Sequence, residues 1–221
     1  MALSKVNFNS LNLTPTASKV VKFNSNNNGL EAGDVGGNTT LLSTQTASSS
    51  STLSFTSGID STYKEYIFKF TDIHPGSNAT FGFQVDTGTN TSYAQEIISS
   101  TFRAYNNEND DDTSLGYASG DDQPQSGEST SALAPQDLAL ISTSNDDSAS
   151  GTLHLFNPSS STFVKNFFGV SNGVKSLGGK QYSYNMFTAG YINTATAITR
   201  VQFKCNTGNI DAGTIKMYGV L

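Results

Sequence analysis

Apolar and polar residues alternate with a period of two through most of the chain after about residue 39. Tyr66, Phe68 and Phe70 project to one face of a run in which Glu65 and Lys69 are polar neighbours, and Phe81, Phe83 and Val85 repeat the alternation after the turn signal Pro75-Gly76. Such alternation is typical of antiparallel strands with one buried face. We therefore predict that these six side chains lie together in one core between two sheets.

Further short runs of the same kind follow along the chain and are separated by clusters of Gly, Asn, Asp and Pro, which favour turns. They cover residues 52–56, 97–105, 152–157, 163–170, 182–191, 197–205 and 214–220, with weak candidates near Leu115 and at residues 138–141. The pattern predicts eight to ten strands in an all-β, antiparallel two-sheet β-sandwich. A jelly-roll-like topology is the leading expectation and a Greek-key sandwich the alternative. Residues 92–100 are the nearest approach to a helix.

The first part of the chain has a different pattern. Residues 18–24 predict one short strand, but residues 24–29 and 33–37 are rich in Asn and Gly and indicate turns or flexible chain. This segment has too few apolar residues for a core of its own. We expect an extended N-terminal arm or anchor at residues 1–38, which attaches to another protein, followed by a β-sandwich domain at residues 39–221.

Composition narrows the class of function. Of the 221 residues only 14% are charged and 35% are apolar, and the net charge is −6. Few charges and few apolar residues argue against a coiled coil, and an acidic chain is poorly suited to bind nucleic acid phosphates. No stretch approaches the 18 apolar residues of a membrane span, and residues 1–10 lack the apolar run of a signal peptide. We expect synthesis in a host cytoplasm without membrane insertion.

Negative charge is concentrated in the middle of the chain. No Lys or Arg occurs between Arg103 and Lys165, where ten acidic residues lie: Glu108, Asp110, Asp111, Asp112, Asp121, Asp122, Glu128, Asp137, Asp146 and Asp147. Like charges repel and stay hydrated, so solvated loops are expected. A surface that binds cations or a partner is the alternative interpretation.

The residues that usually carry catalysis or metal binding are sparse. His74 precedes a proline at a turn, His154 lies within a predicted strand, and the single cysteine, Cys205, falls on the apolar side of another strand. No metal-ligand spacing, nucleophile elbow or phosphate loop occurs. Residues 106–112 carry oxygen ligands suited to Ca²⁺ but lack the Gly and the distant Glu of an EF-hand. We predict no enzyme activity, no catalytic or metal site and no cofactor.

Aromatic side chains are the second class of candidate binding residues. Five tyrosines lie near predicted loops or strand ends and would form a glycan platform if exposed, although packing is the more usual role for Tyr in a sandwich: Tyr105, Tyr117, Tyr182, Tyr184 and Tyr191.

Several stretches resemble the β-module of marine and cyanobacterial bacteriophage virion proteins. They are LLSTQTASSS at residues 41–50, FTSGIDSTY at 55–63, GTLHLFNP at 151–158, AGY at 189–191 and GNIDAGTIKMYG at 208–219. The resemblance spans residues 39–221, and the Gly29-Leu30-Glu31 stretch resembles the linker that precedes such modules. It implies a structural protein of the particle surface, often a trimer, and brings no catalytic residues with it.

The resemblance and the residue pattern lead to one expected function and two alternatives. We expect a virion protein, most specifically a tail-fibre subunit that faces the receptor, which forms homotrimers and joins other virion proteins through its arm. The alternatives are a decoration protein on the capsid and a glycan-binding module that contacts host surface glycan.

Overall fold

The computed structural model describes residues 20–23, 26, 28–33, 38–123 and 133–221. The chain divides into two units, Met1–Asn38 and Thr39–Leu221, and each is described by itself. Glu128 and most of the predicted arm, including residues 1–19, lie outside the described residues.

The described part of the first unit is a two-stranded hairpin, in which β1 (Val20–Phe23) pairs antiparallel with β2 (Leu30–Gly33). The sequence predicted only the first strand and a flexible segment from Gly33. The prediction missed β2 because LEAG is too short to show a period. The register places Val21 beside Ala32 and Phe23 beside Leu30, so one face of the hairpin is apolar. The other face carries the Lys22–Glu31 ion pair at 3.5 Å.

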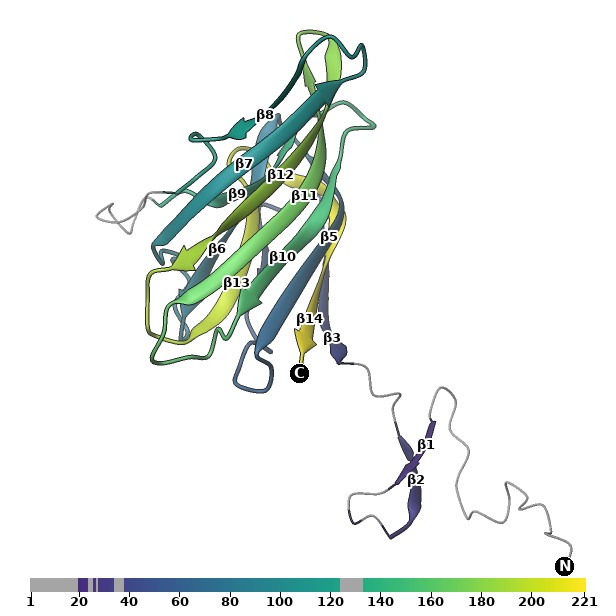
Figure 1. The fold of residues 1–221 in the computed structure, drawn as a ribbon, viewed down its shortest axis with the longest axis vertical. Coiled ribbons are helices and arrows are strands. Elements are labelled where there is room, and N and C mark those ends of the chain that lie inside the picture. The colour runs from purple at the N-terminus through teal and green to yellow at the C-terminus, as the bar shows by residue number, and fades with distance from the viewer. Residues whose placement is uncertain (1–19, 24–25, 27, 34–37, 124–132) are drawn as a thin grey trace, which may run out of the picture. The chain divides into compact units, whose positions relative to one another are not determined.

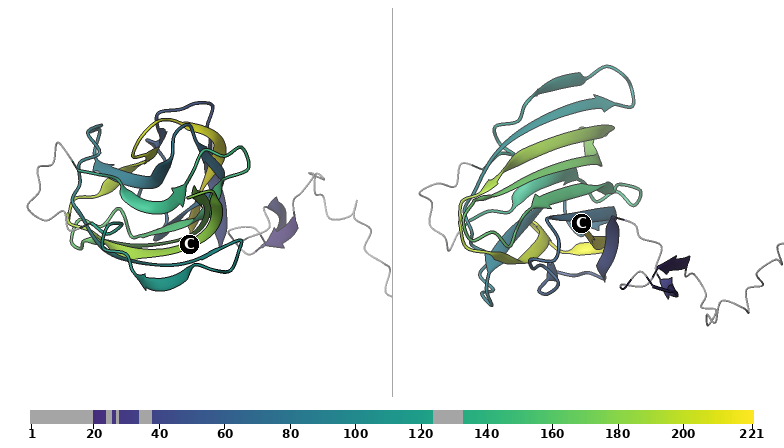
Figure 2. Two further views of the ribbon diagram at one scale, coloured as in Figure 1. Left: turned by 90° about the horizontal axis from the view of Figure 1, so that it is seen from above. Right: turned by 60° about the horizontal axis from the view of Figure 1, so that its bottom comes forward.

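The second unit contains an eight-stranded and a four-stranded antiparallel sheet (Figures 1 and 2). The larger sheet has the order β3-β14-β5-β10-β11-β12-β7-β8 and the smaller sheet β4-β13-β6-β9. Their bounds in chain order are β3 Thr39–Thr46, β4 Leu53–Phe55, β5 Glu65–Pro75, β6 Ala79–Thr87, β7 Ile97–Asn107, β8 Thr113–Tyr117, β9 Gln136–Ile141, β10 Ala149–Phe156, β11 Lys165–Leu177, β12 Lys180–Ile192, β13 Ile198–Cys205 and β14 Ile210–Val220.

The strand order is that of a jelly roll with two added hairpins. Strands β3, β4, β5, β6, β9, β10, β13 and β14, counted one to eight along the chain, lie in the orders 1-8-3-6 and 2-7-4-5, the arrangement of eight strands in two Greek keys. The β7–β8 hairpin is inserted between the fourth and fifth of these strands, and the β11–β12 hairpin between the sixth and seventh. Both hairpins extend the larger sheet beyond β10.

The core lies between the two sheets and is rich in phenylalanine. Phe203 on β13 contacts Phe68 of the opposite sheet at 5.4 Å between ring centroids, and it also contacts Phe55, Phe81 and Phe83 at 5.8 to 6.5 Å. The six side chains predicted to form one core all belong to this buried cluster, as do Cys205 and Leu153. The prediction of a two-sheet core is confirmed.

Close approach of β9 to the larger sheet depends on a glycine. A Cβ atom on Gly173 of β11 would lie 2.4 Å from the carbonyl oxygen of Leu140 on β9, nearer than a real Cβ can come. Ser171 lies two residues before Gly173 on the same face of β11, and its hydroxyl donates a hydrogen bond to the carbonyl oxygen of Leu138. Strand β9 is therefore fixed under β11, which anchors the added strands to the jelly roll.

The expected strands are present, but their number differs from the sequence prediction. The sandwich has more strands than the eight to ten expected, partly because β3, in which two adjacent leucines lie among Ser, Thr and Gln, shows no clear alternation. Residues 92–100 form no helix; they run from a loop into β7. The weak candidates near Leu115 and at 138–141 are the strands β8 and β9.

We expect Phe68→Ala to lower the free energy of unfolding by about 3–5 kcal/mol, because Phe68 is fully buried between the sheets. Phe163→Ala is the matched control. Phe163 is 69% exposed, and its removal should change stability by less than about 0.5 kcal/mol. Denaturant unfolding of the two variants measures both values. Similar small losses for both would contradict the placement of Phe68 in the core.

The carboxyl group of Asp137 on β9 should make the stability of the protein depend on pH. Burial, together with the nearby charge of Asp121, raises the pKa of Asp137 to about 7. Because the folded state binds the proton more tightly than the unfolded chain, this group should lower stability as pH rises from about 4 to about 7. We expect Asp137→Asn to have a flatter dependence of melting temperature on pH between about pH 5 and about pH 8. Asp146→Asn, at an exposed position, should retain the slope of the unmodified protein.

Candidate contact surface on the outer sheet face

The outer face of the larger sheet carries no charged side chain over five neighbouring strands, β10, β11, β12, β7 and β8 (toward the viewer in Figure 1). Core side chains such as Leu153 and Phe167 fix the inner positions of these strands, and alternation assigns the others to the outside. The outer positions are Ser150, Thr152, His154 and Phe156; Asn166, Phe168, Val170, Asn172 and Val174; Ser183, Asn185, Phe187, Ala189 and Tyr191; Ile98, Ser100, Phe102, Ala104 and Asn106; and Thr113, Leu115 and Tyr117.

Five aromatic rings form a continuous row across four of these strands. We call His154 and Phe156 of β10, Phe168 of β11, Phe187 of β12 and Phe102 of β7 the aromatic row. Successive rings are nearly parallel: His154 and Phe168 are 4.3 Å apart at 12°, and Phe187 and Phe102 are 4.9 Å apart at 24°. Phe168 and Phe187 join the two halves at 6.3 Å. The rings therefore cover one another's faces and present their edges to the outside.

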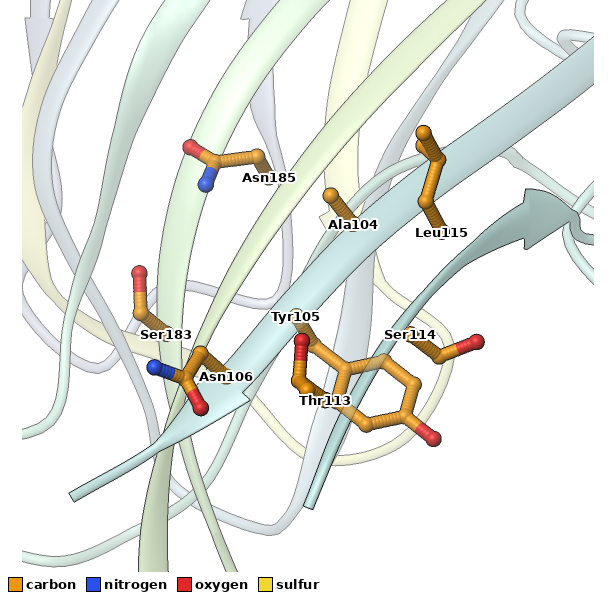
Figure 3. Close-up of a pocket in the computed structure, with 8 residues that line it drawn as sticks. All are labelled: Ala104, Tyr105, Asn106, Thr113, Ser114, Leu115, Ser183 and Asn185. Carbon is orange, nitrogen blue, oxygen red and sulfur yellow. The ribbon is translucent and has the colours of Figure 1, made fainter. Parts of the chain in front are cut away.

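A second row, of amide and hydroxyl groups, lies beside the aromatic row. The side-chain amide of Asn172 donates hydrogen bonds to Ser183 Oγ at 2.8 Å and Asn185 Oδ1 at 3.2 Å. Asn185 and Ser183 also line an open groove of about 350 Å³ that runs between β12, β7 and β8 (Figure 3). All residues that line this groove are uncharged: Ala104, Tyr105, Asn106, Thr113, Ser114, Leu115, Ser183 and Asn185.

The aromatic row ends at a contact between His154 and Glu65, which is an ion pair only when the imidazole is protonated. Nδ1 of His154 lies 2.5 Å from Oε1 of Glu65 on the neighbouring strand β5. This contact fixes the imidazole against Phe168. His74 is distant in the fold from His154, and its Nδ1 lies 2.7 Å from the backbone oxygen of Asp147. The two histidines are thus not brought together.

Two other groups with potential chemistry are held in the interior. Cys205 is buried as predicted, and burial raises the pKa of its thiol to about 11, so the thiolate nucleophile is disfavoured. The ammonium group of Lys165, a residue that the sequence did not single out, is buried and donates hydrogen bonds to the carbonyl oxygens of Phe163 and Thr194 at 2.9 and 3.0 Å. Burial lowers the pKa of Lys165. Its contacts join the two loops that flank the start of β11.

The acidic residues are not all in solvated loops, which corrects the sequence interpretation. Asp147 is 1% exposed and accepts hydrogen bonds from Ser142, Ser176 and Gln181. Asp121 is 7% exposed and pairs with Arg103 at 2.6 Å. The sequence prediction failed because most donors that satisfy these carboxylates, namely Arg103, Ser176 and Gln181, come from other strands.

The candidate calcium segment, residues 106–112, spans the end of β7 and the turn to β8. Its side chains bond within the segment and to β12: Asn107 Nδ2 donates to Asp111 Oδ1 at 2.7 Å, Lys180 Nζ donates to both oxygens of Asp111, and the Tyr182 hydroxyl donates to Asp112. Lys180 lowers the pKa of Asp111. Among the residues that the structure describes, no group of three or more His, Cys, Asp or Glu side chains is arranged to hold a metal ion.

The five candidate tyrosines are divided between core and surface. Tyr182 and Tyr184 are each 6% exposed and form a second buried cluster with Met186 and Leu140, against which Tyr105 packs. Tyr117 is exposed on β8, next to the aromatic row, and Tyr191 is half-buried at an outer position of β12. The phenylalanines of the row were missed as surface residues because an apolar residue in a strand is expected to point inward.

The arrangement is suited to binding by surface contact. It combines exposed apolar edges with neutral hydrogen-bonding groups, and both can be removed from water without the penalty of burying a charge. In the described part of the chain, no helix has the length and apolar character that a membrane span requires.

The comparisons with known proteins give no relative. Neither the family models, nor the curated proteins, nor the solved structures include a significant match to this chain.

Proposed function

We propose that this protein is a structural and adhesion protein of a bacteriophage particle, most specifically a tail-fibre subunit that contacts the receptor through the outer face of its larger sheet. The observation that carries the proposal is the uncharged outer face with its aromatic row. Depletion of charge and enrichment in aromatic residues distinguish the centre of protein interfaces from other surface. Exposed apolar patches of this kind commonly mark binding sites.

The exposed side chains beside and within the row would supply the apolar contact. Phe102 is 48% exposed, Val170 45% and Tyr117 62%. Because the rings are stacked side by side on a hydrogen-bonded sheet, little conformational entropy is left to lose on binding. Rigid aromatic anchors flanked by adaptable amides are the combination that protein-binding surfaces use.

A glycan-binding module is the second candidate, and the groove favours it. Asn106, Ser183 and Asn185 offer neutral donors and acceptors that match sugar hydroxyls. The aromatic row is less suited to sugars, since a sugar ring stacks on an open aromatic face and these faces are covered by neighbouring rings. We therefore favour a protein receptor for the row and limit glycan contact to the groove.

The N-terminal hairpin supports an attachment role for the arm. Its apolar face is exposed, with Val21 at 47% and Phe23 at 69%, and an isolated two-stranded hairpin is only marginally stable in water. Burial against another virion protein would stabilise it. This feature serves a tail fibre and a capsid decoration protein equally well, and labelling of the subunit in particle images separates these two locations.

We expect the double substitution Phe102→Ser and Phe187→Ser to leave the protein folded and to weaken its binding to host cells at least about tenfold. Binding is measured as the inhibition of phage adsorption to host cells by the purified protein, and circular dichroism shows whether each variant is folded. The control is Phe163→Ser with Leu177→Ser, which removes exposed apolar side chains outside the aromatic row. Equal loss in both double variants, or no loss in the first, would contradict the receptor role of the face.

Removal of residues 1–38 should leave a folded sandwich that no longer joins the particle. The expectation follows because both sheets and the core lie within Thr39–Leu221. Thermal unfolding and incorporation into particles are the two measurements. Unfolding of the truncated chain would place the segment in the folding core, and normal incorporation would remove its role as an anchor.

A further inference from the structure

Among the residues that the structure describes, no strand or other element pairs with the outer edge of β8 in the larger sheet. The strand pairs with β7 on one side and ends the strand order on the other, and all five of its residues are exposed. Its sequence, Thr113-Ser114-Leu115-Gly116-Tyr117, contains no proline and no charged residue. Edge strands usually carry such residues, because they prevent the unpaired backbone groups of the edge from bonding to a strand of another chain.

The hydrogen bonds that flank β8 show which backbone groups are open. Asn107 N donates to Asp112 O, and Ala118 N donates to Thr101 O. In an antiparallel ladder the bonded pairs recur every second residue, so Ser114 and Gly116 face β7. The N–H and C=O groups of Thr113, Leu115 and Tyr117 face away from the sheet.

The opposite edge, β3, offers open groups at a matching spacing. Ala47 N donates to Gly213 O, and the register with β14 is continuous from Thr46 to Ser43. The bonded residues are therefore Gln45 and Ser43, and the backbone groups of Thr44 and Thr46 face outward. Thr44 lies beside Lys216, which is an outer-face position like that of Leu115.

Charge distinguishes between pairing of β8 with itself and pairing with β3. Acidic residues without a cationic partner among the described residues lie at both ends of β8, Asp110 and Asp112 before it and Asp122 after it. Two β8 strands in antiparallel pairing would bring these groups together and repel. The segment 38–59 that contains β3 has no charged residue, and the nearest outer-face charges on β14 and β5 are Lys216 and Lys69, a cross-strand pair of like charge.

We propose that β8 of one copy of this chain adds to β3 of a second copy as an antiparallel strand, with Leu115 opposite Thr44 and Thr113 opposite Thr46. This register joins outward-facing backbone groups on both strands and keeps the outer faces of the two sheets continuous. Contact between two different edges is head-to-tail, so successive copies build a ring where the rotation between them closes and an open filament where it does not. The pairing stands apart from the proposed function: a monomer would overturn the pairing and leave a role in the particle intact.

Cysteine pairs placed on the two edges test the register. A mixture of the Leu115→Cys and Thr44→Cys proteins should form a disulfide-linked dimer on mild oxidation, because bonded antiparallel partners have Cα atoms about 5.5 Å apart, within the range of a disulfide. Either variant alone should remain uncrosslinked, and the buried Cys205 should not compete. A mixture of Thr44→Cys with Leu177→Cys, an exposed site on the β11–β12 turn, is the control. Crosslinking of Leu115→Cys with itself, or equal yields from the two mixtures, would overturn the proposal.

Edge-blocking variants provide a second measurement that does not use disulfides. Proline at position 115 removes an outward N–H and leaves the bonds of Ser114 and Gly116 to β7. We expect Leu115→Pro and Leu115→Lys to remain folded and to shift the mass measured by light scattering from an oligomer to a monomer. An unmodified protein that is monomeric across the concentration range, or an oligomer that both variants preserve, would contradict pairing through this edge.

Discussion

The structure depends on the contact of phenylalanine rings between the two sheets. Phe203 lies at the centre of this contact, with Phe68 from the larger sheet and Phe55, Phe81 and Phe83 from the smaller sheet around it. These rings are buried at 2% exposure or less. Their burial supplies the main stabilisation of a chain that is otherwise poor in apolar residues. The eight jelly-roll strands are the frame that holds this core.

The two added hairpins depend on that frame and form most of the candidate contact surface. Strands β11, β12, β7 and β8 extend the larger sheet from β10. The inner sides of β11 and β12 pack on β9, and the inner sides of β12 and β7 carry a cluster of tyrosines. The outer side of all four strands lacks covering elements in the described chain. The absence of charge on this outer side fits contact with a partner better than permanent exposure, since solvated faces usually carry Lys and Glu.

Buried polar groups hold the loops around the frame. Asp86 is fully buried and accepts backbone hydrogen bonds from Thr87 and Tyr93, each at 2.8 Å. Asp147 performs the same role between β9 and β12 through Ser142, Ser176 and Gln181. These carboxylates are satisfied by donors. Asp137 instead retains a raised pKa, because burial is the larger effect there.

The sequence by itself determined the all-β class, the inward positions of β5 and β6, and the burial of Cys205, because alternation with a period of two reports local side-chain direction. Only the tertiary structure decided which strands are neighbours. It brought Phe102, Phe168 and Phe187, separated in the chain, into one row on the outer face, and it buried Asp121 and Asp147 beside distant donors. Local pattern cannot supply these results, since strand order and the pairing of distant residues are set by how the whole chain folds onto its core.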